Sequence, residues 1–107
     1  EELGRAVRFI HDNLHRPIGI EDICNNISMS RRWLEYEFKK TLRCTPHQYL
    51  SRVRVDRARQ LLLSPDRLKL KQVALMCGFT SNKQMNIVFQ RVSGTTPRQY
   101  RASKRKD

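Results

Sequence analysis

Apolar residues recur every three or four positions along nearly the whole chain, which is the spacing of one buried face of an α-helix. The strict alternation typical of half-buried strands is almost absent. A Ser or Thr precedes several of the periodic stretches, as a helix N-cap does, and Pro directly follows two of these caps. The pattern predicts an all-α fold with seven helices, over residues 3–14, 20–27, 31–42, 46–63, 70–77, 82–93 and 97–104.

An internal repeat is the most informative feature of the chain. Residues 45–49 read Thr-Pro-His-Gln-Tyr, and residues 96–100 read Thr-Pro-Arg-Gln-Tyr, an offset of 51 (96 minus 45). Phe38 pairs with Phe89 at the same offset, so the helix before each tail carries a matching apolar face. Self-similarity of this kind indicates that one supersecondary unit was built twice.

The repeat extends backwards with one adjustment. Ile23 pairs with Val73 at an offset of 50, which implies one extra residue, about Thr80, in the second turn. Each half is then a helix, a tight turn and a helix, and one long helix joins the halves. The sequence predicts a first helix-turn-helix unit over residues 3–45, a linker helix over 46–63 and a second unit over 66–107.

A helix-turn-helix needs a small residue where its helices cross, a left-handed turn residue, an apolar plug and a cap on the second helix. In the second half these are Ala74, Gly78, Phe79 and Ser81, and in the first half Cys24, Ser28, Met29 and Ser30. Because Ser28 stands where Gly is easier, the first turn is either less left-handed or strained.

The second helix of the first half has a cationic and aromatic outer face when Leu34, Phe38 and Thr41 point to the core. Residues near the start of such a helix enter the major groove, and cations farther along suit phosphates. Trp33, beside the core face, either packs on a neighbouring helix or touches DNA. The base-contact candidates are Arg31, Arg32, Glu35 and Tyr36, with Arg32 to a guanine the strongest.

Amides dominate the outer face of the matching helix over residues 82–93, where Asn82, Gln84, Asn86 and Gln90 are expected to point outward. Asn can bond an adenine edge through two hydrogen bonds, Lys can reach guanine, and an exposed Ile can pack on a thymine methyl or simply remain at the surface. A core set of Met76, Phe79, Met85 and Phe89 is expected to hold this helix. The base-contact candidates are Asn82, Lys83, Asn86 and Ile87.

The two Thr-Pro helix starts add phosphate sites, because Pro in the first turn leaves backbone N–H groups free at the positive end of a helix. The phosphate-contact candidates of the whole chain are Ser30, Lys39, Lys40, Arg43, Thr45, Ser81, Gln90, Thr96 and Arg98.

Charge narrows the class of partner. The chain carries 22 Lys and Arg against 10 Asp and Glu, a net charge of +12, which favours DNA, RNA or an anionic membrane surface. No run is apolar enough to span a membrane and no signal peptide is visible, so we expect a cytoplasmic protein associated with the nucleoid. Because the chain starts at Glu1 rather than Met, we expect it to be part of a longer protein.

Metal, cofactor and disulfide chemistry are not indicated. Cys24, Cys44 and Cys77 are odd in number and form no Cys-x-x-Cys pair, so reduced thiols in the core are expected. His11 and His15 stand four residues apart, but no further ligands accompany them. We therefore predict neither a metal nor a cofactor.

Taken together, these motifs resemble the DNA-binding domain of the AraC/XylS family of bacterial transcription regulators, over nearly all of the chain. The residues that carry the resemblance are Val73-Ala74, Cys77-Gly78-Phe79, Met85, Phe89, Gly94, Thr96-Pro97 and Tyr100-Arg101, with Ile23, Ser30, Leu34, Phe38, Thr45-Pro46 and Tyr49 in the first half. The sequence departs from the family pattern at Ser28 and at Arg43, which occupies the place of Gly94.

The resemblance implies two reading helices in successive major-groove segments of double-stranded DNA, with base contacts at Arg32, Glu35, Tyr36, Asn82, Lys83, Asn86 and Ile87. It also implies RNA polymerase as a partner, and a separate domain, absent from this chain, that senses a small molecule or dimerises.

Two other classes of function remain as alternatives. Some DNA-repair alkyltransferases carry a similar domain and use a Cys, but no Cys here has a positioned base, which argues against an enzyme. An RNA-binding or membrane-surface module could use the same positive charge.

Overall fold

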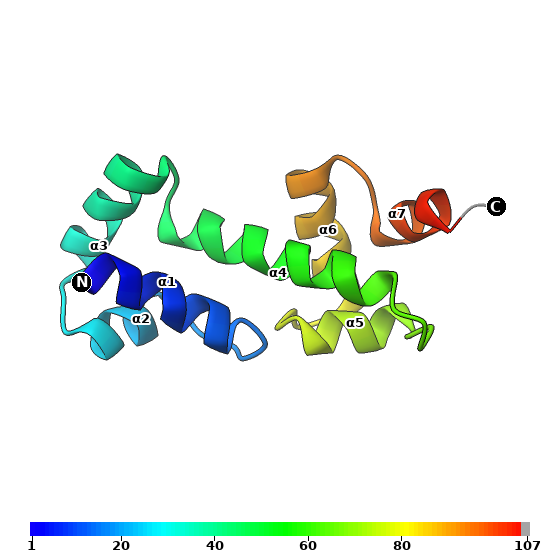
Figure 1. Cartoon of the computed structure of the whole chain (residues 1–107), viewed down its shortest axis with the longest axis horizontal. Coiled ribbons are helices and arrows are strands. Elements are labelled where there is room, and N and C mark those ends of the chain that lie inside the picture. Colours follow the sequence, from blue (N-terminus) through cyan, green and yellow to red (C-terminus); the bar gives the residue numbers. More distant parts are fainter. Residues whose placement is uncertain (106–107) are drawn as a thin grey trace.

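The computed structural model describes residues 1–105, and within that range the helices are joined by turns and loops, with no strand (Figure 1). Its extents are 47 × 22 × 22 Å, so the molecule is elongated. The elements are α1 (Glu2–Asn13), α2 (Ile20–Ile27), α3 (Arg31–Glu37), a π-helical turn η1 (Phe38–Leu42), α4 (Pro46–Leu62), α5 (Leu70–Met76), α6 (Asn82–Ser93) and α7 (Pro97–Lys104).

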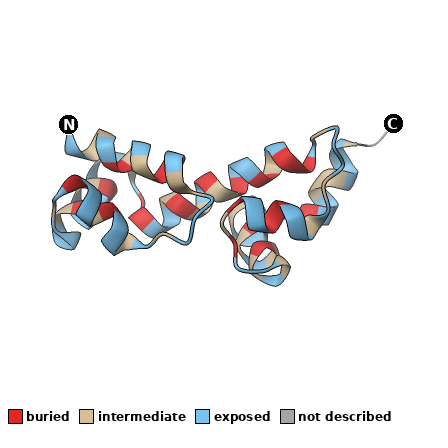
Figure 2. Ribbon diagram, turned by 90° about the horizontal axis from the view of Figure 1, so that it is seen from below, coloured by how far each residue is buried: buried red, intermediate tan, exposed pale blue. Residues whose placement is uncertain are grey.

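The all-α prediction is confirmed, and the predicted helices begin and end within one residue of the observed ones when α3 and η1 are taken as one. Two separate hydrophobic clusters lie along the molecule, one on each side of the midpoint of α4. Leu50 and Val53 of α4 belong to the first cluster, while Val55, Ala58 and Leu62 belong to the second. In Figure 2 the buried positions accordingly fall into two groups, which α4 connects.

The first cluster is built mainly from α1, α2 and the reading segment α3–η1, and the second from α4 to α7. Each is small, so each helix-turn-helix unit depends on a few fully buried side chains. The residues with no exposed surface include Ala6, Ile10, Ile23, Leu34 and Phe38 in the first cluster, and Val73, Ala74, Cys77, Met85 and Phe89 in the second.

The prediction that Thr41 points to the core is wrong, because Thr41 is exposed. The turn from Phe38 to Leu42 is π-helical, with more residues in a turn than an α-helix. This wider turn rotates Leu42 onto the inner face, where it packs against the first cluster, and rotates Thr41 out to solvent.

The inclusion of Met76 in the core set is also wrong. Phe79, Met85 and Phe89 are buried as predicted, but 46% of Met76 is exposed and its neighbour Leu75 is 56% exposed. Helix α5 packs against the second cluster through Val73 and Ala74, so Leu75 and Met76, on its other face, are exposed to solvent.

The turn geometry settles the alternatives left open at Ser28. Ser28 has φ 58° and Arg43 has φ 60°, both in the left-handed region, and the matching residues Gly78 and Gly94 have φ 84° and 80°. The two units therefore use the same turns, and the first unit holds side-chain-bearing residues in a conformation that costs about 1 to 2 kcal/mol each.

Arg54 of α4 makes contacts with both the first and the second unit. Its Nε donates to the carbonyl of Leu14 at 2.9 Å, and its Nη2 donates to the carbonyl of Arg16 at 2.8 Å. Gly78, in the turn of the second unit, packs directly against the same Leu14 carbonyl and the Arg54 guanidinium. The loop after α1 is thereby held against both α4 and the second unit.

Candidate nucleic-acid interface

The first reading segment, α3–η1, begins at Ser30, whose hydroxyl accepts a hydrogen bond from the Trp33 amide at 3.0 Å. Leu34 and Phe38 are fully buried and fix the rotation of the segment. Trp33 is half-buried and packs against the first cluster, which favours the packing interpretation over DNA contact. The predicted contact residues Arg31, Arg32, Glu35, Tyr36, Lys39, Lys40 and Arg43 are all exposed.

The side chains on this face are unequal in how free they are to meet DNA. Arg31 is paired with Glu35 at 3.0 Å, both of them largely exposed, and the Lys40 ammonium lies 5.7 Å from the centre of the Tyr36 ring. Within residues 1–105, Arg32 makes no side-chain hydrogen bond or ion pair. Arg32 therefore has all its donors available for a guanine edge or a phosphate.

The second reading helix, α6, begins at Ser81, whose hydroxyl accepts from the Gln84 amide at 3.0 Å. Lys83 and Gln90 are exposed and Asn86 is half-exposed, as the predicted outer face requires. Ile87 is 52% exposed, so its side chain is free to make an apolar contact with a partner.

Two amides at the start of α6 are less free than the sequence predicts. Oε1 of Gln84 accepts from the Thr80 amide at 2.6 Å, so this side chain completes the cap instead of facing outward. Oδ1 of Asn82 is buried and has no partner among the described residues. Asn82 can bond a base through both amide atoms only if its side chain turns, so Asn86 is the stronger of the two Asn candidates.

The two Thr-Pro helix starts have the same geometry. Thr45 accepts from the Gln48 amide at 3.0 Å, and the Gln48 side chain accepts from the Thr45 amide at 2.9 Å. Thr96 and Gln99 repeat this reciprocal cap at 3.1 and 3.0 Å. Each reciprocal cap satisfies the N-cap amide and one amide of the first turn, so a phosphate at the positive end of either helix would have to use the remaining amides.

Arg91 is missing from the sequence-based candidates, although the repeat identifies it. It is the counterpart of Lys40 at the offset of 51 (91 minus 40), and it is exposed. It follows Lys83 and Ile87 at spacings of four residues, so the three lie along one side of α6.

Most of the positive charge is not neutralised within the chain. Among residues 1–105 only two ion pairs form, Arg31 with Glu35 and Arg59 with Asp56. None of the helices in this range has the length and apolarity needed to cross a bilayer.

Two of the three cysteines, Cys24 and Cys77, lie in environments that disfavour the nucleophilic thiolate. Burial raises the pKa of the Cys77 thiol to about 11 and also raises the pKa of Cys24, so both remain protonated near neutral pH. His11 shares a hydrogen bond with the Tyr49 hydroxyl at 2.9 Å. No group of three or more metal-ligating side chains occurs among the described residues.

Comparison with known proteins identifies the fold and its role. A family model for a helix-turn-helix domain matches residues 23–103. The DNA-binding domain of the transcription factor AdpA, solved in complex with a target DNA, superposes with a TM-score of 0.90 and 31% identity, over 98% of this chain and 94% of that one. The chain belongs to the AraC/XylS family of DNA-binding domains.

Other family members agree. An AraC-type DNA-binding domain protein from Chromobacterium violaceum superposes with a TM-score of 0.88 and 33% identity, over 98% of this chain and 93% of that one. The transcriptional regulator ArgR of Pseudomonas aeruginosa is 34% identical over 104 residues, which are 97% of this chain and 31% of ArgR. The chain thus spans about a third of the length of this relative, and the family consists of DNA-binding regulators rather than enzymes.

Proposed function

We propose that this AraC/XylS-type domain recognises a specific duplex sequence by inserting α3 and α6 into two successive major-groove segments on one face of DNA. The observation that carries the proposal is the duplicated unit: both reading helices extend to the same side of the shared helix α4 in Figure 1. The molecule is 47 Å long, enough for two reading helices to meet the groove one turn apart, about 34 Å.

The footprint of the domain tests this proposal. We expect a sequence selected from random duplexes to be protected over about two turns, roughly 20 bp, on one face. A protected region of only about 6 bp would mean that one reading helix alone engages DNA. Competition with RNA and with anionic vesicles under the same conditions separates duplex recognition from general attraction to polyanions.

The proposed division of labour assigns bases to residues in the first turns of α3 and α6, and assigns phosphates to the N-cap residues and to side chains farther along the helices. Arg32, Arg31, Glu35 and Tyr36 of α3, and Lys83, Asn86, Ile87 and Asn82 of α6, are the proposed base contacts. Phosphates are assigned to Ser30, Lys39, Lys40, Arg43, Thr45, Ser81, Gln90, Thr96 and Arg98. The exposure of Arg32, and of Lys40 about two turns along the same segment, supports this order.

Three substitutions test the division. Arg32→Ala or Asn86→Ala should weaken binding to the selected site by about 1 to 3 kcal/mol and relax preference at one base pair, with little effect on random DNA. Lys40→Ala should weaken specific and random duplexes alike and lower the slope of log K against log salt by about 1. Identical behaviour of Arg32→Ala and Lys40→Ala across a salt series would contradict the separation of base and phosphate contacts.

For the full-length regulator, we propose that a further domain binds a small-molecule effector or dimerises, and that the DNA-bound protein contacts RNA polymerase at a bacterial promoter. The support is the family membership together with the greater length of the relative ArgR.

A further inference from the structure

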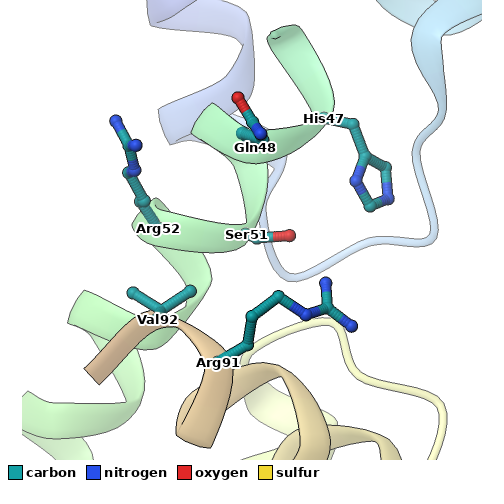
Figure 3. A pocket seen from close by; sticks show the side chains of 6 residues that line it. All are labelled: His47, Gln48, Ser51, Arg52, Arg91 and Val92. Atoms are coloured by element: carbon teal, nitrogen blue, oxygen red, sulfur yellow. The ribbon is translucent and has the colours of Figure 1, made fainter. Parts of the chain in front are cut away.

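A cavity of about 250 Å³ lies between the two units, where the first two turns of α4 meet the last turn of α6 (Figure 3). Figure 3 shows the polar ends of His47, Ser51 and Arg91 turned into the same space, while Arg52 points away from it. The residues that line the cavity are His47, Gln48, Ser51, Arg52, Arg91 and Val92.

The polar groups of this cavity suit an anion. Arg91 brings a guanidinium, Ser51 a hydroxyl and His47 an imidazole, whereas no carboxylate lines the cavity. Asp56, one turn beyond Arg52 on α4, is already bonded to Arg59 at 2.7 Å. No acidic side chain within residues 1–105 forms an ion pair with Arg91, so its charge is available to a ligand.

The position of the cavity indicates which anion. Arg91 ends the side of α6 that carries Lys83 and Ile87, and His47 lies in the first turn of α4, just after the first reading segment ends. A duplex that offers successive major-groove segments to α3 and α6 turns its minor groove, bordered by two phosphate backbones, toward the protein between them. The cavity lies in that interval.

We propose that His47, Ser51 and Arg91 form a binding seat for one backbone phosphate of the DNA. This phosphate lies in the spacer between the two half-sites, which are the major-groove segments that α3 and α6 contact. This inference rests on the proposed function. The seat differs from the other phosphate candidates because its residues come from both α4 and α6. Binding of a phosphate there therefore depends on the distance between the half-sites. A guanidinium bonded to phosphate adds orientation as well as affinity.

Duplexes in which single spacer phosphates are replaced by neutral methylphosphonates test the seat. In the selected site, we expect one neutral linkage to weaken wild-type binding by roughly tenfold, the effect of losing one charge-assisted hydrogen bond. Arg91→Ala should weaken the unmodified duplex to a similar extent and lower the salt slope by about 0.9. The neutral linkage should have no further effect on Arg91→Ala, and Ser51→Ala should show a smaller loss that depends on the same linkage.

Arg8→Ala is the matched control, because Arg8 is an exposed Arg of α1 outside the seat and its substitution removes the same charge. It should leave the sensitivity to each neutral linkage unchanged. Independent, additive losses from Arg91→Ala and from every neutral spacer linkage would overturn the seat, while the two-turn footprint would still uphold the proposed function. If the wild type selects no duplex at all, the proposed function fails and the seat fails with it.

A free phosphate could use the same chemistry, and a titration without DNA distinguishes the two sources. Inorganic phosphate is added to the wild type and to Arg91→Ala while the amide resonances of residues 47–52 are followed by NMR. Saturable shifts that need Arg91, combined with indifference to all spacer linkages, would assign the cavity to a small phosphate ligand and overturn the DNA assignment. Dependence on one spacer linkage supports it.

Discussion

Gly78 and Gly94 have nearly the same backbone conformation but different surroundings. Both have φ near 80°. A Cβ on Gly78 would lie 2.1 Å from the Leu14 carbonyl oxygen and 2.8 Å from Nε of Arg54, whereas a Cβ on Gly94 would meet nothing within 4 Å. Gly94 is therefore needed for its conformation alone, and Gly78 also for the close approach of the two units.

This difference predicts unequal costs for the same substitution. Gly94→Ala should lower the free energy of unfolding by about 1 to 2 kcal/mol, the strain of a left-handed residue. Gly78→Ala should lower it by a further amount of about 1 to 3 kcal/mol, because backbone must move to admit the Cβ. Urea unfolding of the two variants measures both, and equal losses would show that the Leu14 contact yields easily.

The buried thiol of Cys77 predicts a loss of stability at high pH. Burial raises its pKa from about 9 to about 11, so between these values the unfolded chain releases the proton and the folded chain keeps it. The stabilising contribution is complete below about pH 9 and is lost as the pH rises toward 11, an effect of roughly 2 to 3 kcal/mol. In Cys77→Ala, unfolding free energies across this range should fall less steeply; parallel curves would contradict the assignment.

At the scale of the element, α6 has one face that packs in the core and an exposed face that we propose contacts DNA. Phe89 is fully buried and Ile87, two residues away, is 52% exposed. Phe89→Ala should lower the free energy of unfolding by about 3 to 5 kcal/mol, because it opens a cavity in the second cluster. Ile87→Ala should change stability by less than about 0.5 kcal/mol.

Thermal unfolding of both variants, together with binding to the selected site, measures the two roles. Ile87→Ala should weaken binding while the fold remains intact. Wild-type stability in Phe89→Ala would mean that the assigned inner face of α6 is wrong. Leu34→Ala is the corresponding test in the first unit, where Leu34 has no exposed surface.

On the scale of the whole molecule, Arg54 couples the two units. It donates to two carbonyls of the loop after α1 and contacts Gly78 of the second unit, and burial lowers its pKa. Arg54→Met keeps much of the volume but leaves both carbonyls without this donor, and should lower the free energy of unfolding by about 2 to 4 kcal/mol.

Loosening the units should also relax the required spacing of the half-sites. The wild type should discriminate strongly against duplexes with one base pair inserted between the half-sites, and Arg54→Met should discriminate several-fold less. Arg57→Met, an exposed Arg one turn along α4, is the control and should keep wild-type discrimination. Unchanged discrimination in Arg54→Met would mean that other contacts hold the units in place.

The sequence by itself determined the elements and their duplication. Helical periodicity, Ser and Thr caps and the two Thr-Pro starts are local signals, because they depend on backbone hydrogen bonding within a few residues. They predicted the seven helices and, through the repeat, the exposed faces of both reading helices. The repeat also contained Arg91, which only a direct comparison with Lys40 would have revealed.

Tertiary structure decided what depends on contacts between distant residues or on departures from ideal helix geometry. The π-helical turn places Thr41 at the surface, and Met76, at the end of the short helix α5, is exposed. The Gln84 side chain accepts a hydrogen bond from the Thr80 amide and so does not face outward from α6. Arg54 donates a hydrogen bond to the Leu14 carbonyl, and His47 and Arg91 line one cavity. Each of these pairs joins segments about 40 residues apart in the sequence, a separation at which helical periodicity carries no information. Spacing along one helix fixes which face a side chain occupies, but only packing between helices fixes what that face meets.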